Sequence, residues 1–155
     1  MERDDVERVF REDGTRLWRA VLAYAGGRSD VATEAVAEAF ARALEHRERI
    51  RKPVPWIYRT AIRVASEELR RGRRSGALVE TAGDDGLGDL GELMKALRRL
   101  SPNQRAAVVL HYEEGFKVRE VAALLGMSSA TVKVHLHRGR KRLRELLGSE
   151  EAGDA

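Results

Sequence analysis

A glycine- and aspartate-rich segment, residues 76–91, interrupts this chain of 155 residues. Four glycines and three aspartates stand within its last nine residues. Such a composition is unfavourable for a helix and typical of a flexible linker. The stretches on either side are each shorter than a domain of usual size, so we expect two small domains rather than one large core.

Both flanking stretches have the composition and the hydrophobic spacing of helices. The chain has only 3 prolines, and it is rich in alanine, leucine, glutamate and arginine, which favour helix. The predicted fold class is therefore all-α, with two small helical domains joined by a flexible linker. The expected boundaries are a first domain at 1–75, an acidic linker at 76–91, a second domain at 92–148 and an acidic tail at 149–155.

Three helices are expected in the first domain. The first has an apolar stripe that includes Phe10, and it ends at the glycine pair 26–27, since glycine adopts the left-handed cap conformation at little cost. Ser29 or Asp30 can cap the second helix. The third is expected from 56 to about 71, after two prolines that suit a loop and a first helical turn.

The second domain has clearer helix boundaries. Ser101 as cap and Pro102 as first residue start a helix whose apolar face is predicted to include Tyr112. A short helix over 117–125 follows, then a glycine-containing turn, then a long helix capped by Ser128 that reaches about residue 147. Two helices joined by such a turn form a helix-turn-helix, which places its second helix in the major groove of DNA.

The last helix is predicted to bind DNA through its polar side. Between 133 and 144 it has six arginines or lysines, two histidines and no acidic residue, whereas a merely solvated face usually mixes both signs. Arginine and lysine can read guanine, and valine can contact a thymine methyl group. The candidate contact residues are Ser129, Thr131, Lys133, Val134, His137, Arg138, Arg140 and Lys141.

The distribution of charge supports a polyanionic partner. The formal net charge of +4 is the balance of +4 over 1–75, −4 over 76–91, +7 over 92–147 and −3 over 148–155. Basic blocks attract nucleic acid, although surface arginines and lysines are often only solvated.

Several classes of protein are excluded at this stage. The chain has 0 cysteines, which excludes disulfides and cysteine zinc sites. There is no apolar run long enough for a membrane span, and the start is too acidic for a signal peptide. The 4 histidines lack metal spacing, and no catalytic constellation is visible. We expect a soluble cytoplasmic protein without enzymatic activity, cofactor, metal or membrane insertion.

These motifs resemble the extracytoplasmic-function (ECF) class of bacterial sigma factors, whose members carry regions two and four. The second domain resembles region four, and the first resembles region two. The residues that carry the resemblance are Leu100-Ser101-Pro102, Gly115, 118–128, Thr131-Val132-Lys133 and 136–143 for region four, and 38–43, 55–61 and 69–71 for region two. The resemblance implies core RNA polymerase, promoter DNA and an anti-sigma factor as partners, with region two melting the minus-ten element and region four binding the minus-thirty-five element.

The residues after 46 suit the melting role that the resemblance implies. Melted DNA needs cations for its backbone and apolar or aromatic surfaces for its bases. The candidate minus-ten residues are Arg47, Arg49, Ile50, Arg51, Lys52, Trp56, Tyr58, Arg59 and Arg63. Of the two aromatic residues, Trp56 is expected chiefly in the core, whereas Tyr58 is expected to face away from it and contact DNA.

A third set, Glu34, Glu38 and Arg42, belongs by resemblance to the surface that docks on the polymerase clamp. Ordinary solvated side chains are the alternative interpretation. Val31 and Ala37 replace an acidic residue and a glutamine that are usual in the family, and Arg63 replaces a usual asparagine. Val31 and Ala37 lie in the segment that resembles the clamp-docking motif, and Arg63 lies in the helix that resembles the melting helix.

Two other functions remain open at this point. The first is a stand-alone helix-turn-helix regulator that binds duplex DNA without polymerase. The second is a polymerase-binding protein that does not melt promoters.

Overall fold

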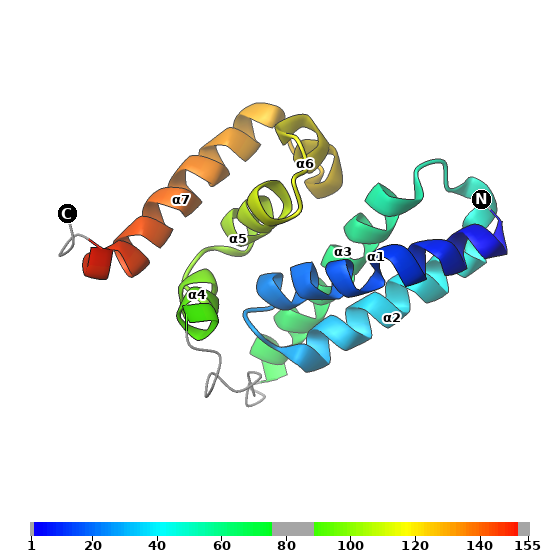
Figure 1. Ribbon diagram of the computed structural model, residues 1–155, viewed down its shortest axis with the longest axis horizontal. Coiled ribbons are helices and arrows are strands. Elements are labelled where there is room, and N and C mark those ends of the chain that lie inside the picture. Colours follow the sequence, from blue (N-terminus) through cyan, green and yellow to red (C-terminus); the bar gives the residue numbers. More distant parts are fainter. Residues whose placement is uncertain (1, 76–88, 152–155) are drawn as a thin grey trace. The chain divides into compact units, whose positions relative to one another are not determined.

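The computed structural model describes residues 2–75 and 89–151, and it places side chains over 2–72 and 91–148. Within these residues every regular element is a helix (Figure 1), so the predicted all-α fold is confirmed. The chain divides into two compact units, Met1–Val79 and Glu80–Ala155. None of the described helices is both long enough and apolar enough to cross a membrane.

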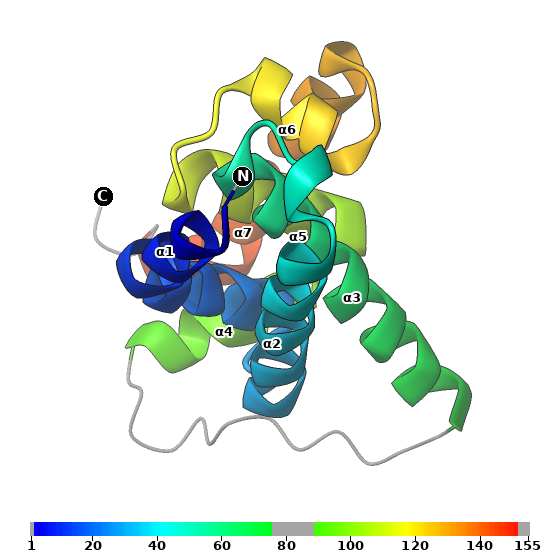
Figure 2. The ribbon, with the colours of Figure 1, turned by 90° about the vertical axis from the view of Figure 1, so that its right-hand side faces the viewer.

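The first unit is a bundle of three helices. It contains α1 (Arg3–Tyr24), α2 (Ser29–Glu45), the short 3-10 helix η1 (Arg47–Arg49) and α3 (Pro53–Ser75). Each long helix packs against the other two, as Figure 2 shows. Leu17, Val21 and Ile57 are at most 1% exposed and form the centre of this core.

Small residues allow α2 and α3 to pack closely. Alanines of both helices have no exposed surface, and their short side chains let two helix backbones approach. They are Ala32, Ala35, Ala39, Ala43, Ala61 and Ala65.

The junction between α1 and α2 differs in one detail from the sequence prediction. Gly26 and Gly27 have φ values of 66° and 93°, so the predicted glycine stop is confirmed. The cap of α2 is Arg28, however, and not Ser29 or Asp30. Asp30 instead lies in the first turn, where its Oδ2 atom accepts a hydrogen bond from Arg28 Nη2 at 2.7 Å. This hydrogen bond lowers the pKa of Asp30 below its ordinary value.

The second unit contains five helical elements within the described residues. They are α4 (Asp89–Arg98), α5 (Pro102–Val108), the π-helical turn η2 (Val109–Glu113), α6 (Val118–Leu125) and α7 (Ser129–Glu151). α4 begins at Asp89, inside the predicted linker 76–91, and residues 76–88 of that prediction lie outside the described residues. α7 extends to Glu151, past the expected end, and the last four residues of the predicted tail are likewise not described.

The predicted caps at Ser101 and Ser128 and the predicted turn at Gly126 are confirmed. Ser101 accepts a hydrogen bond from the backbone N–H of Gln104 and caps α5. Gly126 ends α6 in the left-handed conformation, with φ 67° and ψ 39°. Ser128 Oγ accepts a hydrogen bond from the backbone N–H of Thr131 at 3.1 Å, which caps α7.

Gly139 lies where α7 packs against α5. A Cβ atom at this position would be 2.8 Å from Cγ2 of Val108 and 3.5 Å from the backbone oxygen of Gln104. Glycine is therefore required by the close approach of the two helices rather than by backbone conformation.

Two aromatic residues that were predicted on apolar helix faces are exposed instead. Phe10 is 56% exposed and Tyr112 is 50% exposed. Tyr112 leaves the apolar face because the chain passes into the π-helical turn η2 at Val109. A π-turn takes more residues than an α-turn, so residues after it point in other directions than a regular α-helix would give them.

Candidate nucleic-acid interface

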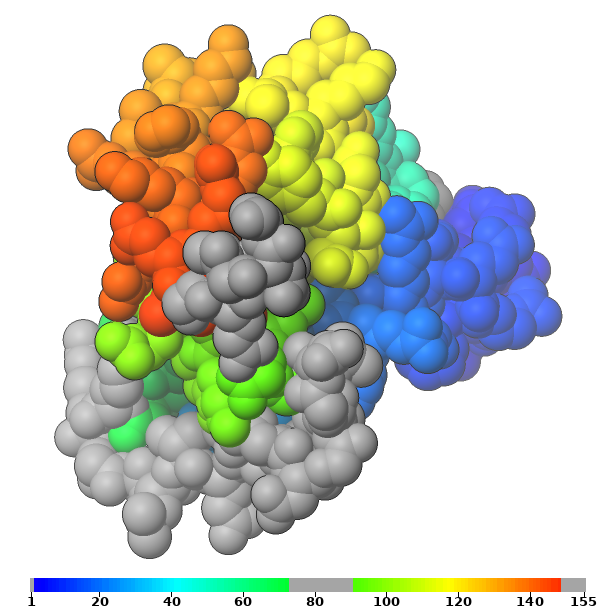
Figure 3. Space-filling view, turned by 60° about the vertical axis from the view of Figure 1, so that its left-hand side comes forward, coloured from blue at the N-terminus to red at the C-terminus, as the bar shows by residue number. Residues whose placement is uncertain are grey.

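The predicted contact face of α7 is open to solvent. Its buried residues are Val132, Leu136 and Gly139, which turn the opposite side of the helix outward. All eight candidates, Ser129, Thr131, Lys133, Val134, His137, Arg138, Arg140 and Lys141, are exposed. Figure 3 shows α7, in orange and red, along one flank of this unit with the yellow α6 segment beside its first turns.

Four cations of this face have no carboxylate partner in the described part of the unit. Over the described residues 91–148, no carboxylate pairs with Lys133, Arg138, Arg140 or Lys141, whereas Arg142 lies 3.4 Å from Glu145. Unpaired cations on an exposed helix attract a polyanion at little desolvation cost. The helix-turn-helix and its charge therefore define a DNA-binding protein.

Some side chains of this face line up in a row, because α-helical positions repeat every 3.6 residues. Lys133, His137, Arg140 and Arg144 follow one another at spacings of four, three and four and form one row. Arg138 lies on the other side of the exposed face. Arg144 was not among the predicted contacts, although its position four residues after Arg140 could have indicated it.

The loop before α3 supplies some, but not all, of the predicted minus-ten residues. Arg49, Arg51 and Lys52 are exposed. Arg47 is half-buried, and its Nη1 atom donates a hydrogen bond to the backbone oxygen of Leu44 at 3.0 Å. Ile50 is only 4% exposed. A contact between Ile50 and DNA stays a prediction, and the buried side chain of Ile50 offers little surface for it.

Of the two aromatic residues of α3, Tyr58 is buried against expectation, and Trp56 is only partly buried. Tyr58 is 3% exposed and lines an interior gap with Leu17 and Phe40, so the expectation that it faces away from the core is wrong. Trp56 is half-buried and shares the outward face of α3 with Arg59 and Arg63, which are exposed. The structure thus brings together Trp56, Arg59 and Arg63 and excludes Tyr58.

The predicted polymerase-binding residues share the outward face of α2. Glu34 and Arg42 are exposed, and Glu38 is half-buried. Glu38 Oε1 accepts a hydrogen bond from Arg42 Nε at 2.9 Å, so these two charges compensate each other. Val31 is 3% exposed. A hydrophobic residue suits this position because an unpaired carboxylate would be costly to bury there.

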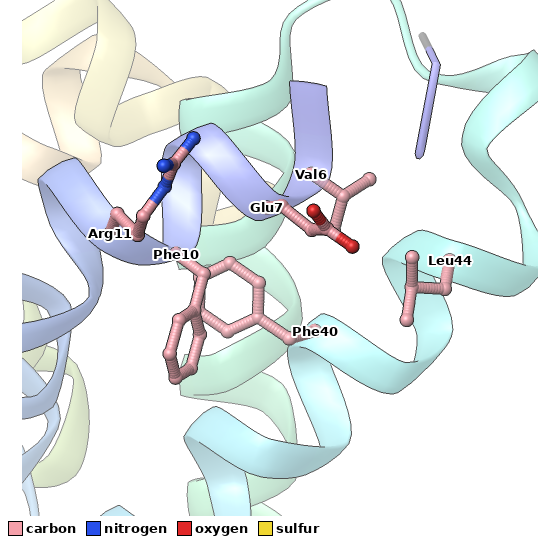
Figure 4. Close-up of a pocket in the computed structure, with 6 residues that line it drawn as sticks. All are labelled: Val6, Glu7, Phe10, Arg11, Phe40 and Leu44. Atoms are coloured by element: carbon pink, nitrogen blue, oxygen red, sulfur yellow. The ribbon is translucent and has the colours of Figure 1, made fainter. Parts of the chain in front are cut away.

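An apolar pocket of about 350 Å³ lies between α1 and α2. The ring of Phe10 meets the ring of Phe40 edge to face, with centroids 5.0 Å apart (Figure 4). Val6 and Leu44 also line the pocket, and Glu7 and Arg11 complete it. It lacks a cluster of polar groups that would orient a small ligand, and the described residues contain no group of three His, Asp or Glu side chains suited to a metal.

Each of the two units matches a known family. The sequence matches the family models "Sigma-70 region 2" over residues 9–75 and "Sigma-70, region 4" over residues 90–143. The RNA polymerase sigma-E factor of Streptomyces antibioticus is 34% identical over 140 residues, which cover 90% of this chain and 73% of that protein. The chain belongs to the ECF class of the sigma-70 family of RNA polymerase sigma factors. Sigma factors are non-catalytic, in agreement with the expectation that the chain is not an enzyme.

Two other sigma factors are also similar to this chain. The RNA polymerase sigma factor CarQ of Myxococcus xanthus is 36% identical over 108 residues, which cover 63% of this chain and 62% of CarQ, less than two thirds of that protein. A solved structure of the sigma factor RpoE in complex with the anti-sigma factor NepR, from Bartonella quintana, has a TM-score of 0.81 at 25% identity. The matched residues cover 93% of this chain and 97% of the compared chain in that structure.

Proposed function

We propose that this chain directs core RNA polymerase to particular promoters as an ECF sigma factor. In this proposal the domain at 1–75 binds and melts the minus-ten element, and the domain at 92–148 binds the minus-thirty-five element. The segment 76–91 connects them, and the protein acts in the cytoplasm, where polymerase and promoter DNA are found. The observation that carries the proposal is the exposed face of α7, which is free of acidic residues from 133 to 144.

The length of α7 divides its contacts into two kinds. From Ser129 to Arg140 the helix rises about 16 Å, which exceeds the major-groove width of ~12 Å. Residues of the first turns, such as Lys133 and Val134, are therefore proposed to reach base edges. Arg140 and Lys141 are proposed to contact phosphates beyond the groove edge.

The outward face of α3 supports a role in melting. Trp56 offers an aromatic surface on which an unpaired base can stack, while Arg59 and Arg63 offer positive charge for the backbone. Arg49, Arg51 and Lys52 extend this charge along the preceding loop. A base that leaves the duplex loses its pairing and stacking, and a protein surface of this kind compensates for part of that loss.

The outward face of α2 is the proposed contact with the polymerase clamp. Glu34 provides a carboxylate that no described residue neutralises, whereas Glu38 is already paired with Arg42. We also propose an anti-sigma factor as a partner, since the similar RpoE was solved in complex with the anti-sigma factor NepR.

The experiment that tests the function uses the purified full chain and core RNA polymerase. Start sites are first mapped after induced expression, and one mapped promoter is then transcribed in vitro. We expect promoter-specific transcripts only when the chain is added to core enzyme. A chain that never binds core polymerase in size-exclusion or pull-down assays contradicts the proposal.

The ion pair between Glu38 and Arg42, together with Ala37 in place of glutamine, favours a second candidate with a weaker polymerase contact. In that case the chain is a stand-alone helix-turn-helix regulator, and it gives a duplex footprint without polymerase. A third candidate binds polymerase but does not melt the promoter. Permanganate reactivity of thymines in the minus-ten element separates it from the first, because only unpaired thymines react.

A further inference from the structure

Tyr112 connects the turn before the helix-turn-helix to the exposed face of α7. Arg140 Nη1 donates a hydrogen bond to Tyr112 Oη at 3.2 Å, between residues 28 positions apart. Tyr112 is 50% exposed, so burial of its apolar surface does not by itself fix the position of its ring. Among the described residues, the hydroxyl of Tyr112 makes its one hydrogen bond with a residue proposed to bind DNA.

The surroundings of Tyr112 hold its ring in place. The ring of His111 meets it edge to face, with centroids 4.9 Å apart and planes at 68°. His111 Nδ1 lies 2.8 Å from the backbone oxygen of Phe116. Because a carbonyl oxygen only accepts, Nδ1 donates the proton, and the imidazole is fixed in orientation. The hydroxyl of Tyr112 therefore occupies a defined position.

A hydroxyl partner affects arginine differently from a carboxylate. The guanidinium of Arg140 has five N–H donors, and the hydroxyl of Tyr112 occupies one without adding negative charge. Within the described residues no carboxylate pairs with Arg140, in contrast to Arg142, which lies beside Glu145. The side chain of Arg140 is thus restrained while its charge and its other donors stay available.

We propose that Tyr112 is a positioning residue for DNA binding. Its hydroxyl holds Arg140 in line with Lys133 and His137, in the conformation that contacts a backbone phosphate at the edge of the minus-thirty-five element. Ordering a long side chain before binding lowers the entropy cost of the contact. This inference rests on the proposed function, because it concerns the same DNA.

The test is a double-mutant cycle with the full chain bound to core RNA polymerase. The probe is a fluorescent duplex that spans the minus-thirty-five element of a promoter mapped as above, titrated at several KCl concentrations. Tyr112→Phe is expected to weaken binding about three- to tenfold. Tyr112→Phe should leave the slope of log affinity against log salt concentration unchanged, since no charge is lost. Arg140→Ala should lower that slope by about 1.

The decisive variant combines both changes. In the Arg140→Ala background, Tyr112→Phe should have no further effect on affinity, because the group that it positions is gone. Lys95→Ala is the matched control: Lys95 is an exposed cation of α4 that pairs with Glu92 at 3.5 Å, and its loss should change neither affinity nor slope. The thermal unfolding midpoint of Tyr112→Phe should equal that of the unsubstituted chain.

Two results would overturn the positioning role. One is an equal loss on Tyr112→Phe in both backgrounds, which would make Tyr112 act independently of Arg140. The other is unchanged binding by Tyr112→Phe or Arg140→Ala while the unsubstituted holoenzyme binds the duplex; the proposed function then stands. A holoenzyme that fails to bind the duplex at all contradicts both proposals.

Discussion

Trp56 and Tyr58 stand two positions apart on α3 and have different surroundings. Two positions on an α-helix are about 200° apart, so the two rings point to nearly opposite sides. Tyr58 is packed in the core and Trp56 lies on the outward face with Arg59. The rotation of α3 about its axis therefore decides which aromatic ring can meet DNA, and the core contacts of Tyr58 set that rotation.

Replacing Trp56 should impair promoter opening more than folding. Trp56→Ala is expected to remove about 1–3 kcal/mol of base stacking, and Trp56→Phe should restore much of it. The measurement is permanganate reactivity of the minus-ten thymines, with urea unfolding of the same variants as the control. A variant that loses stability but still opens the promoter at the original rate would place Trp56 in the core only.

The contact between Arg28 and Asp30 should make stability depend on pH in the acid range. The pKa of Asp30 is lowered from 3.8 in the folded chain, mainly by its hydrogen bond to Arg28. Its contribution is therefore complete above about pH 4, near the unfolded pKa. It is lost as the pH falls through the lower pKa of the folded state.

Asp30→Asn should accordingly destabilise the first unit at pH 7 and make no difference well below pH 4. Urea unfolding at pH 7, 5, 4 and 3 measures this. In an Arg28→Ala background the same substitution should have a smaller effect at pH 7, because only the backbone N–H groups that also lower the pKa of Asp30 remain. A destabilisation that persists undiminished at the lowest pH would assign it to packing instead.

At the scale of helices, the distance between α5 and α7 depends on one missing side chain. Gly139 faces Val108, whose Cγ2 atom would be too close to an added methyl group. Valine is branched at Cβ and has few alternative rotamers, so the neighbour cannot easily turn away. α7, the second helix of the helix-turn-helix, therefore packs against α5 at a short backbone distance that only glycine permits.

Gly139→Ala should lower the stability of the second unit by about 1–2 kcal/mol, because overpacking outweighs the gain in helix propensity. Val108→Ala makes room for the new methyl group, so Gly139→Ala should be neutral or stabilising in that background. Thermal unfolding of the four members of this cycle measures the coupling. Additive losses would mean that Val108 is not the residue in conflict.

Helix boundaries were more predictable from the sequence than helix faces. Ser101, Gly126 and Ser128 act through bonds to their own neighbours, so their types and positions identify the ends of α5, α6 and α7. Which side of a helix is buried depends on packing partners that lie far away in the sequence. Trp56 and Tyr58 are both aromatic, and spacing alone did not determine which of them the core would take.

Departures from regular helices limited the prediction at two other residues. Ile50 follows the 3-10 helix η1, where a 3.6-residue period has no meaning, and its burial could not be read from spacing. Tyr112 lies in the π-helical turn η2, which shifts the phase of the apolar pattern. The row from Lys133 to Arg140, by contrast, lies on regular helix and was predicted with its exposure.

At the scale of the whole chain, the proposed function makes DNA affinity a sum over separate basic regions rather than a property of one residue. Residues 1–75 and 92–147 carry net charges of +4 and +7. Each phosphate that a cation neutralises releases a counterion, so the salt dependence of binding counts such contacts across the chain.

Lys141→Ala should reduce the slope of log affinity against log salt by about 1 and weaken binding to all duplex sequences alike. Titration of the holoenzyme against matched and mismatched promoter duplexes at several salt concentrations checks this. Lys95→Ala, which removes a paired cation of α4, should leave the slope unchanged. A loss confined to one promoter sequence would instead assign Lys141 to a base.

The alanines between α2 and α3 have a consequence for the way that the first unit meets a melted strand. A methyl group has no alternative rotamers, so the alanines of this core cannot turn to accommodate a shift of α3. Any shift would open a void or press backbone against backbone. The face of Trp56 and Arg59 is therefore a stiff template, and in the proposed function the flexible nucleotide strand is the partner that adapts its shape.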